Sequence, residues 1–120
     1  MQTVLIVDDS RTERELMSRA VSFAGFSPVF AEDGNEAVVK AKSLQPALIL
    51  MDVVMPNLNG FNATRQLKAD AATKHIPIVL VTTKTGDSDK FWGKKQGADD
   101  HVCKPFVSNE LVDIIRRYVR

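Results

Sequence analysis

The chain has 120 residues, 44% of them hydrophobic and 26% charged, and its formal net charge is +1. This length predicts a single domain over residues 1–120 with its own hydrophobic core, and the near-zero charge argues against a nucleic-acid-binding or membrane-surface protein. The single cysteine, the absence of a basic and apolar leader, and the lack of any stretch that could span a bilayer together predict a cytoplasmic protein without membrane insertion.

Short apolar runs alternate with stretches in which apolar residues recur every three or four positions. The runs predict buried strands because they are short and rich in β-branched residues, and the periodic stretches predict amphipathic helices. In the first half, the predicted elements are a strand at 4–7, a helix from Ser10 to Gly25, a strand at 26–31, a helix from Asp33 to Pro46 and a strand at 47–51. In the second half, they are a helix at 61–68, a strand at 76–81, a helix at 87–96, a strand at 101–103 and a last helix capped by Ser108.

Individual residues add detail to these elements. Ser10 opens a capping box with Glu13, and Pro28 must lie in an edge strand because proline cannot donate to a sheet ladder. Cys103 is expected to be a small buried hydrophobe in the last strand. Apolar residues at helical spacing are Leu16, Ala20 and Phe23 in the first helix, Ala37, Val38 and Ala41 in the second, and Leu111, Ile114, Ile115 and Tyr118 in the last.

The alternation of strands and helices predicts an α/β fold, a doubly wound five-stranded parallel sheet with helices on both faces. Such sheets bind ligands at the carboxyl ends of their strands. Polar side chains gather at those ends: Asp8 and Asp9 follow the first strand, Asp52 the third, Thr82 the fourth and Lys104 the fifth. Only the predicted edge strand delivers none, so we expect a polar site at this rim of the sheet.

The chemistry of these residue types points to phosphoryl transfer. Asp8 and Asp9 stand where a nucleotide-binding fold has its glycine-rich loop, and paired carboxylates favour a hard cation such as Mg²⁺. Asp52 could act as a nucleophile that forms an acyl phosphate, with Lys104 as a counter-charge and Thr82 as a hydroxyl donor. Taken singly, each has a simpler alternative, namely a helix cap, a turn residue, a strand end or a solvated lysine. Lys104 also precedes a proline, whose peptide bond could be cis or trans.

Four segments together resemble the response regulator receiver family, and the resemblance covers the whole chain. They are Leu-Ile-Val-Asp-Asp-Ser at 5–10, Leu-Met-Asp-Val-Val-Met-Pro-Asn-Leu-Asn-Gly at 50–60, Val-Thr-Thr at 81–83 and Cys-Lys-Pro-Phe at 103–106. The resemblance implies a flavodoxin-like or CheY-like sheet of strand order 2-1-3-4-5, which agrees with an edge position for Pro28.

The resemblance also implies a role for each motif residue. Asp52 is the expected phosphoacceptor, Thr82 the switch hydroxyl and Lys104 the lysine that pairs with the phosphoryl group. Mg²⁺ is the expected cofactor, held by Asp9, Asp52 and the backbone carbonyl of Val54, with Asp8 acting through a metal-bound water. A narrower resemblance, carried by residues 81–98, is to stand-alone regulators of twitching motility and type IV pili, and it implies chemotaxis-type signalling.

Two departures from the family pattern affect switching and lifetime. His101 stands where the family usually has a switching tyrosine or phenylalanine; it could move as they do, with a ring that titrates near neutral pH, or be a partly exposed histidine without a switching role. Val54 and Lys84, two residues after Asp52 and Thr82, are poorly suited to orient an attacking water. We therefore expect a phosphoryl lifetime of many minutes or longer.

The leading functional hypothesis is a switch module of a two-component system rather than an enzyme. A partner histidine kinase, expected to be of the chemotaxis type, donates the phosphoryl group, and a surface formed by the fourth helix, fifth strand and fifth helix then contacts a protein target. Self-phosphorylation from small donors and slow self-dephosphorylation are also expected. The alternatives are a phosphate sink without an output partner and a Mg²⁺-dependent phosphohydrolase with Asp52 as nucleophile.

Overall fold

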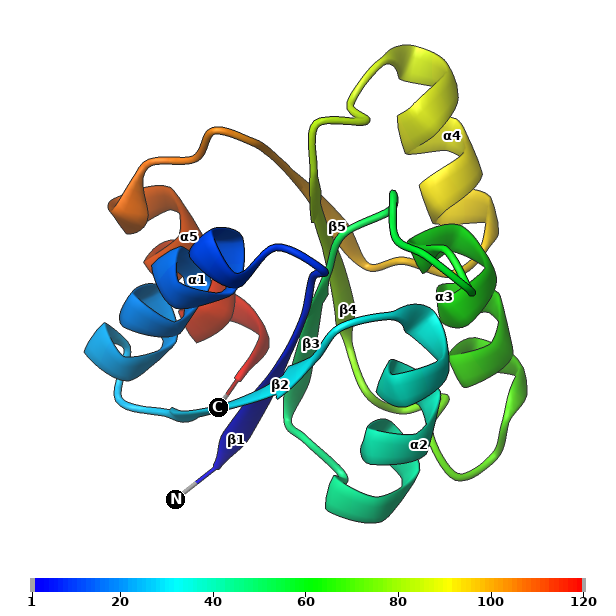
Figure 1. Ribbon diagram of the computed structural model, residues 1–120, viewed down its shortest axis with the longest axis horizontal. Coiled ribbons are helices and arrows are strands. Elements are labelled where there is room, and N and C mark those ends of the chain that lie inside the picture. Colours follow the sequence, from blue (N-terminus) through cyan, green and yellow to red (C-terminus); the bar gives the residue numbers. More distant parts are fainter. Residues whose placement is uncertain (1, 120) are drawn as a thin grey trace.

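A computed structural model describes residues 2–119, and it contains the ten elements expected from the sequence (Figure 1). The strands are β1 (Thr3–Val7), β2 (Ser27–Ala31), β3 (Leu48–Met51), β4 (Ile78–Thr82) and β5 (Asp100–Cys103). The helices are α1 (Arg11–Phe23), α2 (Gly34–Leu44), α3 (Gly60–Ala69), α4 (Asp87–Lys95) and α5 (Ser108–Tyr118). The predicted boundaries agree with these to within one or two residues at most ends.

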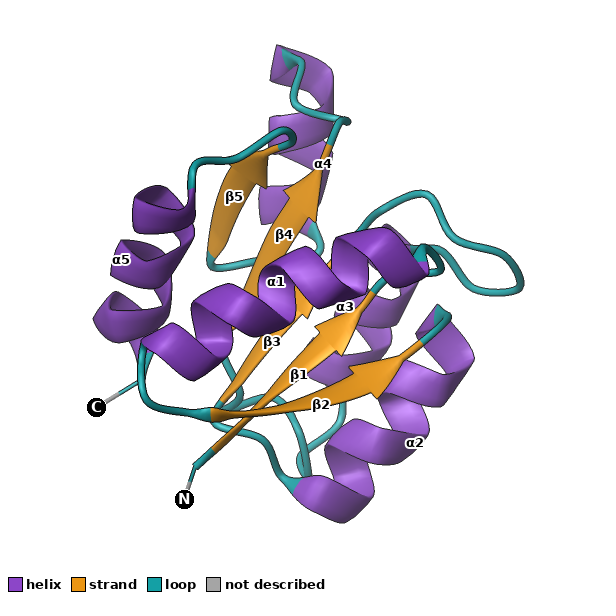
Figure 2. Cartoon of the chain, turned by 60° about the vertical axis from the view of Figure 1, so that its left-hand side comes forward, coloured by secondary structure: helices purple, strands orange, loops and turns teal. Residues whose placement is uncertain are grey.

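The strands form one parallel sheet in the order β2-β1-β3-β4-β5, which confirms the predicted fold and topology. Pro28 lies in β2 opposite Val4, at the edge of the sheet as its missing N–H requires. Every residue of β3 and β4 is buried, because helices cover both faces of these central strands. Figure 2 shows the strands running in one direction, so that their carboxyl ends meet at one rim.

Alternation along the strands divides the core into two layers. In β3, Leu48 and Leu50 pack with α1 and α5, whereas Ile49 and Met51 pack with α2 and α3. Figure 1 shows the same division, with α1 and α5 on one side of the sheet and α2, α3 and α4 on the other. Since successive side chains of a strand point to opposite faces, uniformly apolar strands supply both layers at once.

Helix α1 buries a different set of residues from the one at the predicted spacing. Ala20 is buried as expected, but Leu16 is 43% exposed and Phe23 is 74% exposed. Met17 and Val21 are fully buried in their place. The helix offers two overlapping apolar stripes, and its orientation on the sheet and against α5 selects the one that contains Met17.

Two further predictions near the C-terminus were wrong. Ser108 does not cap α5: it is the first residue of the helix, and the N-cap position is held by Val107, which makes no side-chain capping bond. Cys103 is exposed rather than buried, because it ends an edge strand. Its Sγ atom lies 3.3 Å from the Thr85 hydroxyl instead of in the core.

Helix α4 is held to the sheet differently from the other helices. Gly93 is its only buried residue, and no α4 side chain within residues 2–119 belongs to either core layer. A Cβ atom at Gly93 would lie 2.8 Å from Leu80 Cδ1, so the helix backbone itself rests on β4.

No helix in the described part of the chain is both long and apolar enough to cross a membrane.

Candidate phosphoryl-acceptor site

The predicted site residues come together at the carboxyl ends of the central strands. Asp8 and Asp9 directly follow β1, Asp52 directly follows β3, Thr82 is the last residue of β4 and Lys104 directly follows β5. The parallel pairing of β1 with β3, of β3 with β4 and of β4 with β5 brings these ends to one rim. Residues separated by almost a hundred positions in the sequence therefore share one site.

Three carboxylates form the acidic part of this site. Asp8, Asp9 and Asp52 each offer an oxygen within 4.8 Å of the other two. Asp8 is buried, Asp52 is largely buried and Asp9 is exposed, so the cluster opens to solvent on one side. Oxygen-only donors at this spacing suit a hard divalent cation such as Mg²⁺. The site thus fits the metal that the sequence motifs imply, with Val54 two residues beyond Asp52 in the adjoining loop.

Lys104 supplies the positive charge between the acids. Its ammonium Nζ lies 2.5 Å from an oxygen of Asp8 and 3.2 Å from an oxygen of Asp52, with Glu13 at 3.9 Å. The Lys104–Pro105 peptide bond, whose isomer the sequence left open, is cis. Burial lowers the pKa of Lys104. The hydrogen bond and charge of Asp8, and then those of Asp52, raise it by more, so the pKa of Lys104 lies above its ordinary value.

Asp8 is the most deeply buried acid of the cluster, 1% exposed. Burial raises its pKa, and the hydrogen bonds from Lys104 and from the Ser10 backbone N–H offset only part of that effect. Arg14 of α1 donates to the backbone carbonyl of Asp8 at 2.8 Å, so the helix also fixes the loop that carries the acid. Sequence reasoning missed this role of Arg14, because nothing in its local pattern shows which carbonyl it reaches.

The loop after Asp52 is held by the start of α3. The Val53 N–H donates to a carboxylate oxygen of Asp52 at 2.7 Å, and the Gly60 N–H donates to the Val53 carbonyl at 2.8 Å. A Cβ atom at Gly60 would stand 2.1 Å from the Asp52 carbonyl oxygen, a distance that only glycine permits. Gly60, the last residue of the motif at 50–60, is thus a positioning residue for the Asp52 loop.

Thr82 and His101 meet the same residue of the β4–α4 loop. The Thr82 hydroxyl accepts a hydrogen bond from the Lys84 N–H at 3.2 Å, and His101 Nε2 lies 2.9 Å from the Lys84 carbonyl oxygen. Thr82 is fully buried, whereas His101 is partly buried on β5. His101 therefore lies apart from the acidic cluster but is joined to Thr82 through the backbone of Lys84.

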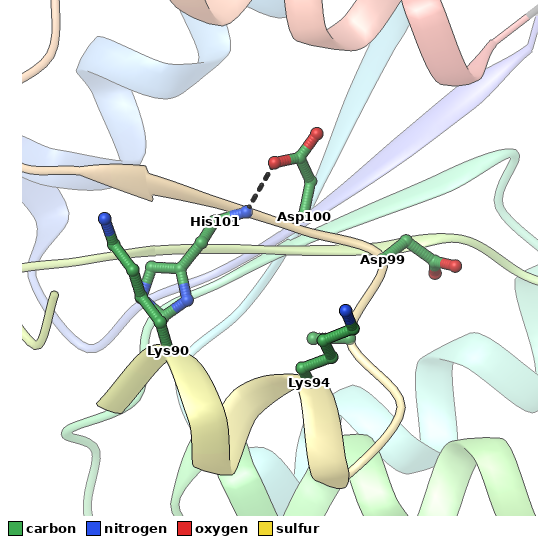
Figure 3. Close-up of a pocket in the computed structure, with 6 residues that line it drawn as sticks. Lys90, Lys94, Asp99, Asp100 and His101 are labelled. Atoms are coloured by element: carbon green, nitrogen blue, oxygen red, sulfur yellow. Dashed lines mark hydrogen bonds between the residues drawn. The ribbon is translucent and has the colours of Figure 1, made fainter. Parts of the chain in front are cut away.

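His101 also lines a cavity of about 270 Å³ between α4 and β5. Figure 3 shows Lys90 on α4 beside the His101 ring and Lys94 farther along the helix below Asp99, with Asp100 next to His101. The dashed line in that view is the 2.9 Å bond from the His101 N–H to the Asp100 carboxylate. That bond occupies a backbone donor at the open edge of β5.

Comparison with known proteins places this geometry in a family. Residues 4–116 match the model of the response regulator receiver domain. Protein PilH of Pseudomonas aeruginosa is 46% identical over 115 residues, which cover 96% of this chain and 95% of that protein. The DNA-binding response regulator MtrA of Mycolicibacterium smegmatis is 37% identical over 99% of this chain, and the chain spans about half (51%) of its length.

Solved structures agree with the sequence comparisons. The chemotaxis protein CheY4 of Vibrio cholerae superposes with a TM-score of 0.92 at 34% identity, covering 99% of both chains. The receiver domain of a sensor histidine kinase from Pseudomonas aeruginosa, solved with a magnesium ion coordinated in its active-site cleft, superposes with a TM-score of 0.90 at 29% identity. It covers 98% of this chain and 96% of that one.

Proposed function

This chain belongs to the response regulator receiver family, as the receiver domain of a two-component response regulator, and from that premise we propose that Asp52 is its phosphoryl acceptor. The observation that carries the proposal is the position of the Lys104 ammonium, 3.2 Å from the Asp52 carboxylate at the rim where Asp8 and Asp9 converge. An acceptor needs positive charge on both sides of the incoming phosphoryl group: Lys104 supplies it on one side, and a cation held by the carboxylates would supply it on the other.

We propose that Mg²⁺ binds with Asp9, Asp52 and the Val54 carbonyl as ligands, and with Asp8 acting through a bound water. When bound, the metal neutralises charge on the acceptor and on the phosphoryl oxygens. The chain's own residues then orient the acceptor: the Val53 N–H holds one oxygen of Asp52 in place, and Lys104 lies against the other.

In the proposed reaction, an Asp52 oxygen attacks the phosphorus of a phosphohistidine on a partner kinase. The new O–P bond forms as the N–P bond breaks, and the histidine leaves with its electron pair. Lys104 neutralises the added charge, and the Thr82 hydroxyl exchanges its bond with the Lys84 N–H for one with a phosphoryl oxygen. Because His101 contacts the same residue, this exchange would carry to the surface of α4, β5 and α5, where we propose that a protein target binds.

We further propose that residues 1–120 work as one cytoplasmic receiver domain in type IV pilus or chemotaxis-type motility signalling. The 46% identity to Protein PilH over nearly the full length of both chains supports this assignment. The donor would be a histidine kinase of the chemotaxis type.

The proposed chemistry includes self-phosphorylation from small acyl phosphates and slow self-dephosphorylation. The Val54 side chain is 57% exposed beside the acceptor loop, and its isopropyl group has no hydrogen-bonding atom with which to hold a water. We expect a half-life of many minutes or longer for the phosphorylated protein. A half-life of seconds would contradict this part of the proposal.

The test is intact-mass measurement after incubation with acetyl phosphate, with and without Mg²⁺. We expect the wild type to gain one phosphoryl group only with Mg²⁺, and Asp52→Asn to gain none. Asp113→Asn, an exposed acid on α5, is the matched control and should behave as the wild type does. Modification of Asp52→Asn equal to that of the wild type would overturn the assignment of the acceptor.

Further measurements separate the alternatives. Continued release of phosphate over many turnovers on small phosphate esters would favour a phosphohydrolase over a phosphoacceptor. A partner captured only in the presence of acetyl phosphate would favour an output regulator over a phosphate sink. For the switch, His101→Phe should change the affinity of the phosphorylated form for that partner, and equal affinities would remove His101 from the switch.

A further inference from the structure

The loop that joins β3 to α3, residues 52–59, carries the Val54 carbonyl that we propose as a Mg²⁺ ligand. Within residues 2–119 this carbonyl accepts no backbone hydrogen bond, so its position depends on how the neighbouring residues of the loop are held. On one side of Val54, the Gly60 N–H donates to the Val53 carbonyl. The loop on the other side of Val54 is held by contacts with α2.

Two hydrogen bonds join the second half of this β3–α3 loop to the start of α2 (Figure 1). Asn57 Nδ2 donates to a carboxylate oxygen of Asp33, the N-cap residue of α2, at 2.7 Å. The Gly34 N–H donates to the Leu58 carbonyl at 3.0 Å. A Cβ atom at Gly34 would lie 2.3 Å from the Leu58 carbonyl oxygen, so the two backbones approach this closely only because residue 34 is glycine.

Both residues of the side-chain bond are well placed for it. One oxygen of Asp33 accepts from the Glu36 N–H at 2.8 Å, which leaves the other oxygen for Asn57. The bond from Glu36, and then that from Asn57, lowers the pKa of Asp33 below its ordinary value, so the carboxylate is charged at neutral pH. Asn57 has a φ of 66°, a left-handed conformation that asparagine adopts more readily than most residues. A charged acceptor at the end of a helix thus meets a donor whose residue type suits its backbone.

This bond also connects the edge strand to the site. Asp33 lies two residues after the end of β2, whereas the acidic cluster follows β1 and β3. Because β2 runs parallel to β1, it ends at the same rim of the sheet. Asp33 therefore reaches the β3–α3 loop from the side of the sheet beyond β1.

We propose that Asp33 and Asn57 are positioning residues for the Mg²⁺ site. Their bond holds the β3–α3 loop so that the Val54 carbonyl stays within reach of a cation bound by the acidic cluster. The inference rests on the metal site proposed above, and it gives a role to two residues that are not metal ligands. Mg²⁺ requires near-ideal octahedral geometry, whereas Ca²⁺ accepts a flexible arrangement of oxygens. A loosened loop should therefore weaken the binding of Mg²⁺ more than that of Ca²⁺.

The experiment is a titration of the unmodified protein with MgCl₂, and separately with CaCl₂, followed by the NMR shifts of backbone amides. Asn57→Gly removes the donor, keeps the net charge and allows the left-handed conformation. We expect it to raise the dissociation constant for Mg²⁺ about tenfold, because loss of a partner that supports a metal ligand commonly has this effect. The constant for Ca²⁺ should rise by less. A bond that only stabilised the fold would not change the ratio of the two constants.

An exchange of the two side chains tests the bond itself. The double variant Asp33→Asn with Asn57→Asp keeps the net charge, retains a capping side chain on α2 and reverses donor and acceptor. It should bind Mg²⁺ more tightly than Asn57→Gly does and recover most of the wild-type affinity. The matched control is Asn59→Ser in the same loop. The Asn59 side chain caps α3 instead of contacting α2, and serine can replace it as a cap, so both constants should stay unchanged.

The results separate failure of the metal site from failure of the positioning role. A wild type whose amide shifts do not respond to Mg²⁺ would remove the proposed metal site and this inference with it. If the wild type binds Mg²⁺ and Asn57→Gly binds it equally well, the metal site stands and the positioning role is wrong. Equal losses of Mg²⁺ and Ca²⁺ affinity, or an exchange variant no better than Asn57→Gly, would also contradict the positioning role.

Discussion

Helices α5 and α4 flank the same edge strand, but they are attached to the protein in different ways. Helix α5 buries Leu111, Val112, Ile114 and Ile115 in the core layer that it shares with α1. Helix α4 buries only Gly93 and exposes Phe91 and Trp92. Each follows a strand that delivers a residue to the site, α5 after Lys104 and α4 after Thr82. Two helices that both follow site-bearing strands therefore differ in how firmly they are packed, and so in how readily each can move when the site changes.

The physical reason lies in what each helix would lose by moving. A shift of α5 would expose four apolar side chains, each of which contributes about 1.5–3 kcal/mol when fully buried. A shift of α4 would expose little apolar surface, so its position depends on the contact at Gly93 and on the loop that joins it to Thr82. Regions with few buried apolar contacts open and move most readily. Helix α4 is therefore the element best suited to report a change at the strand ends.

The difference between α4 and α5 is tested most directly by truncating one large side chain on each helix. Leu111→Ala should lower the free energy of unfolding by about 2–5 kcal/mol, because it leaves a cavity in the core layer. Trp92→Ala should lower it by less than about 1 kcal/mol, although the side chain removed is larger. Urea unfolding of the two variants measures both values. Equal losses would show that α4 is packed as firmly as α5.

The second test concerns the glycine beneath the acceptor loop. Gly60→Ala should cost about 1–3 kcal/mol of stability or more, since the new methyl group would meet the Asp52 backbone carbonyl, which cannot move independently. Displacement of that carbonyl should also slow phosphorylation by acetyl phosphate. Unfolding curves and the rate of mass gain provide the two measurements. A variant with wild-type values for both would contradict the positioning role of Gly60.

A smaller effect is expected where the end of α5 is tied to β5. The Tyr118 hydroxyl donates to the Asp100 carboxylate at 3.0 Å, and Tyr118→Phe should cost about 1 kcal/mol at neutral pH. Burial, then the bond to Asp100, raises the pKa of Tyr118 above its ordinary value of 10.0. The folded state therefore holds this proton more tightly than the unfolded chain does.

The stability contributed by the Tyr118 hydroxyl depends on pH because its pKa is higher in the folded state than in the unfolded chain. The stability from Tyr118 is fully present below pH 10.0 and is lost as pH rises through the raised pKa of the folded state. The difference in unfolding free energy between wild type and Tyr118→Phe should shrink over that alkaline range. A difference that stayed constant above pH 10 would show that the hydroxyl proton does not contribute as described.

The smallest effect is expected at the contact that holds α4. Gly93→Ala should change the unfolding free energy by less than about 1 kcal/mol, because the helix-propensity gain of alanine offsets the crowding of Leu80. The crowded atom is the end of a side chain, which can shift, unlike the carbonyl beside Gly60. A loss as large as that of Leu111→Ala would mean that α4 is anchored through Gly93 far more tightly than its burial indicates.

Much of the fold and the identity of the site residues could be predicted from the sequence. Apolar runs, the capping residue Ser10 and the proline of β2 are local features, and the structure contains the elements and edge position they predict. Polar residues at strand ends could be assigned to one rim because parallel strands share a direction. Their proposed roles in phosphoryl transfer stay predictions that the mass measurement tests.

Other features depended on contacts between distant segments. The choice of Met17 rather than Leu16 for the core, the reach of Arg14 to the Asp8 carbonyl and the closeness of Gly60 to Asp52 each depend on how two elements pack. The exposure of Phe91 is another such feature, because the sequence of α4 alone does not show that the helix contacts the sheet through Gly93.

The order and type of the elements, the parallel sheet and the set of polar residues at its rim could therefore be predicted, because each depends on the spacing of residues close together in the chain. Contacts between distant segments determine which stripe of α1 is buried, how Lys104 lies between Asp8 and Asp52, and that α4 exposes its aromatic residues to solvent. These features depend on how the elements are positioned relative to one another. Packing sets those positions, and each packed surface is formed by residues from more than one element.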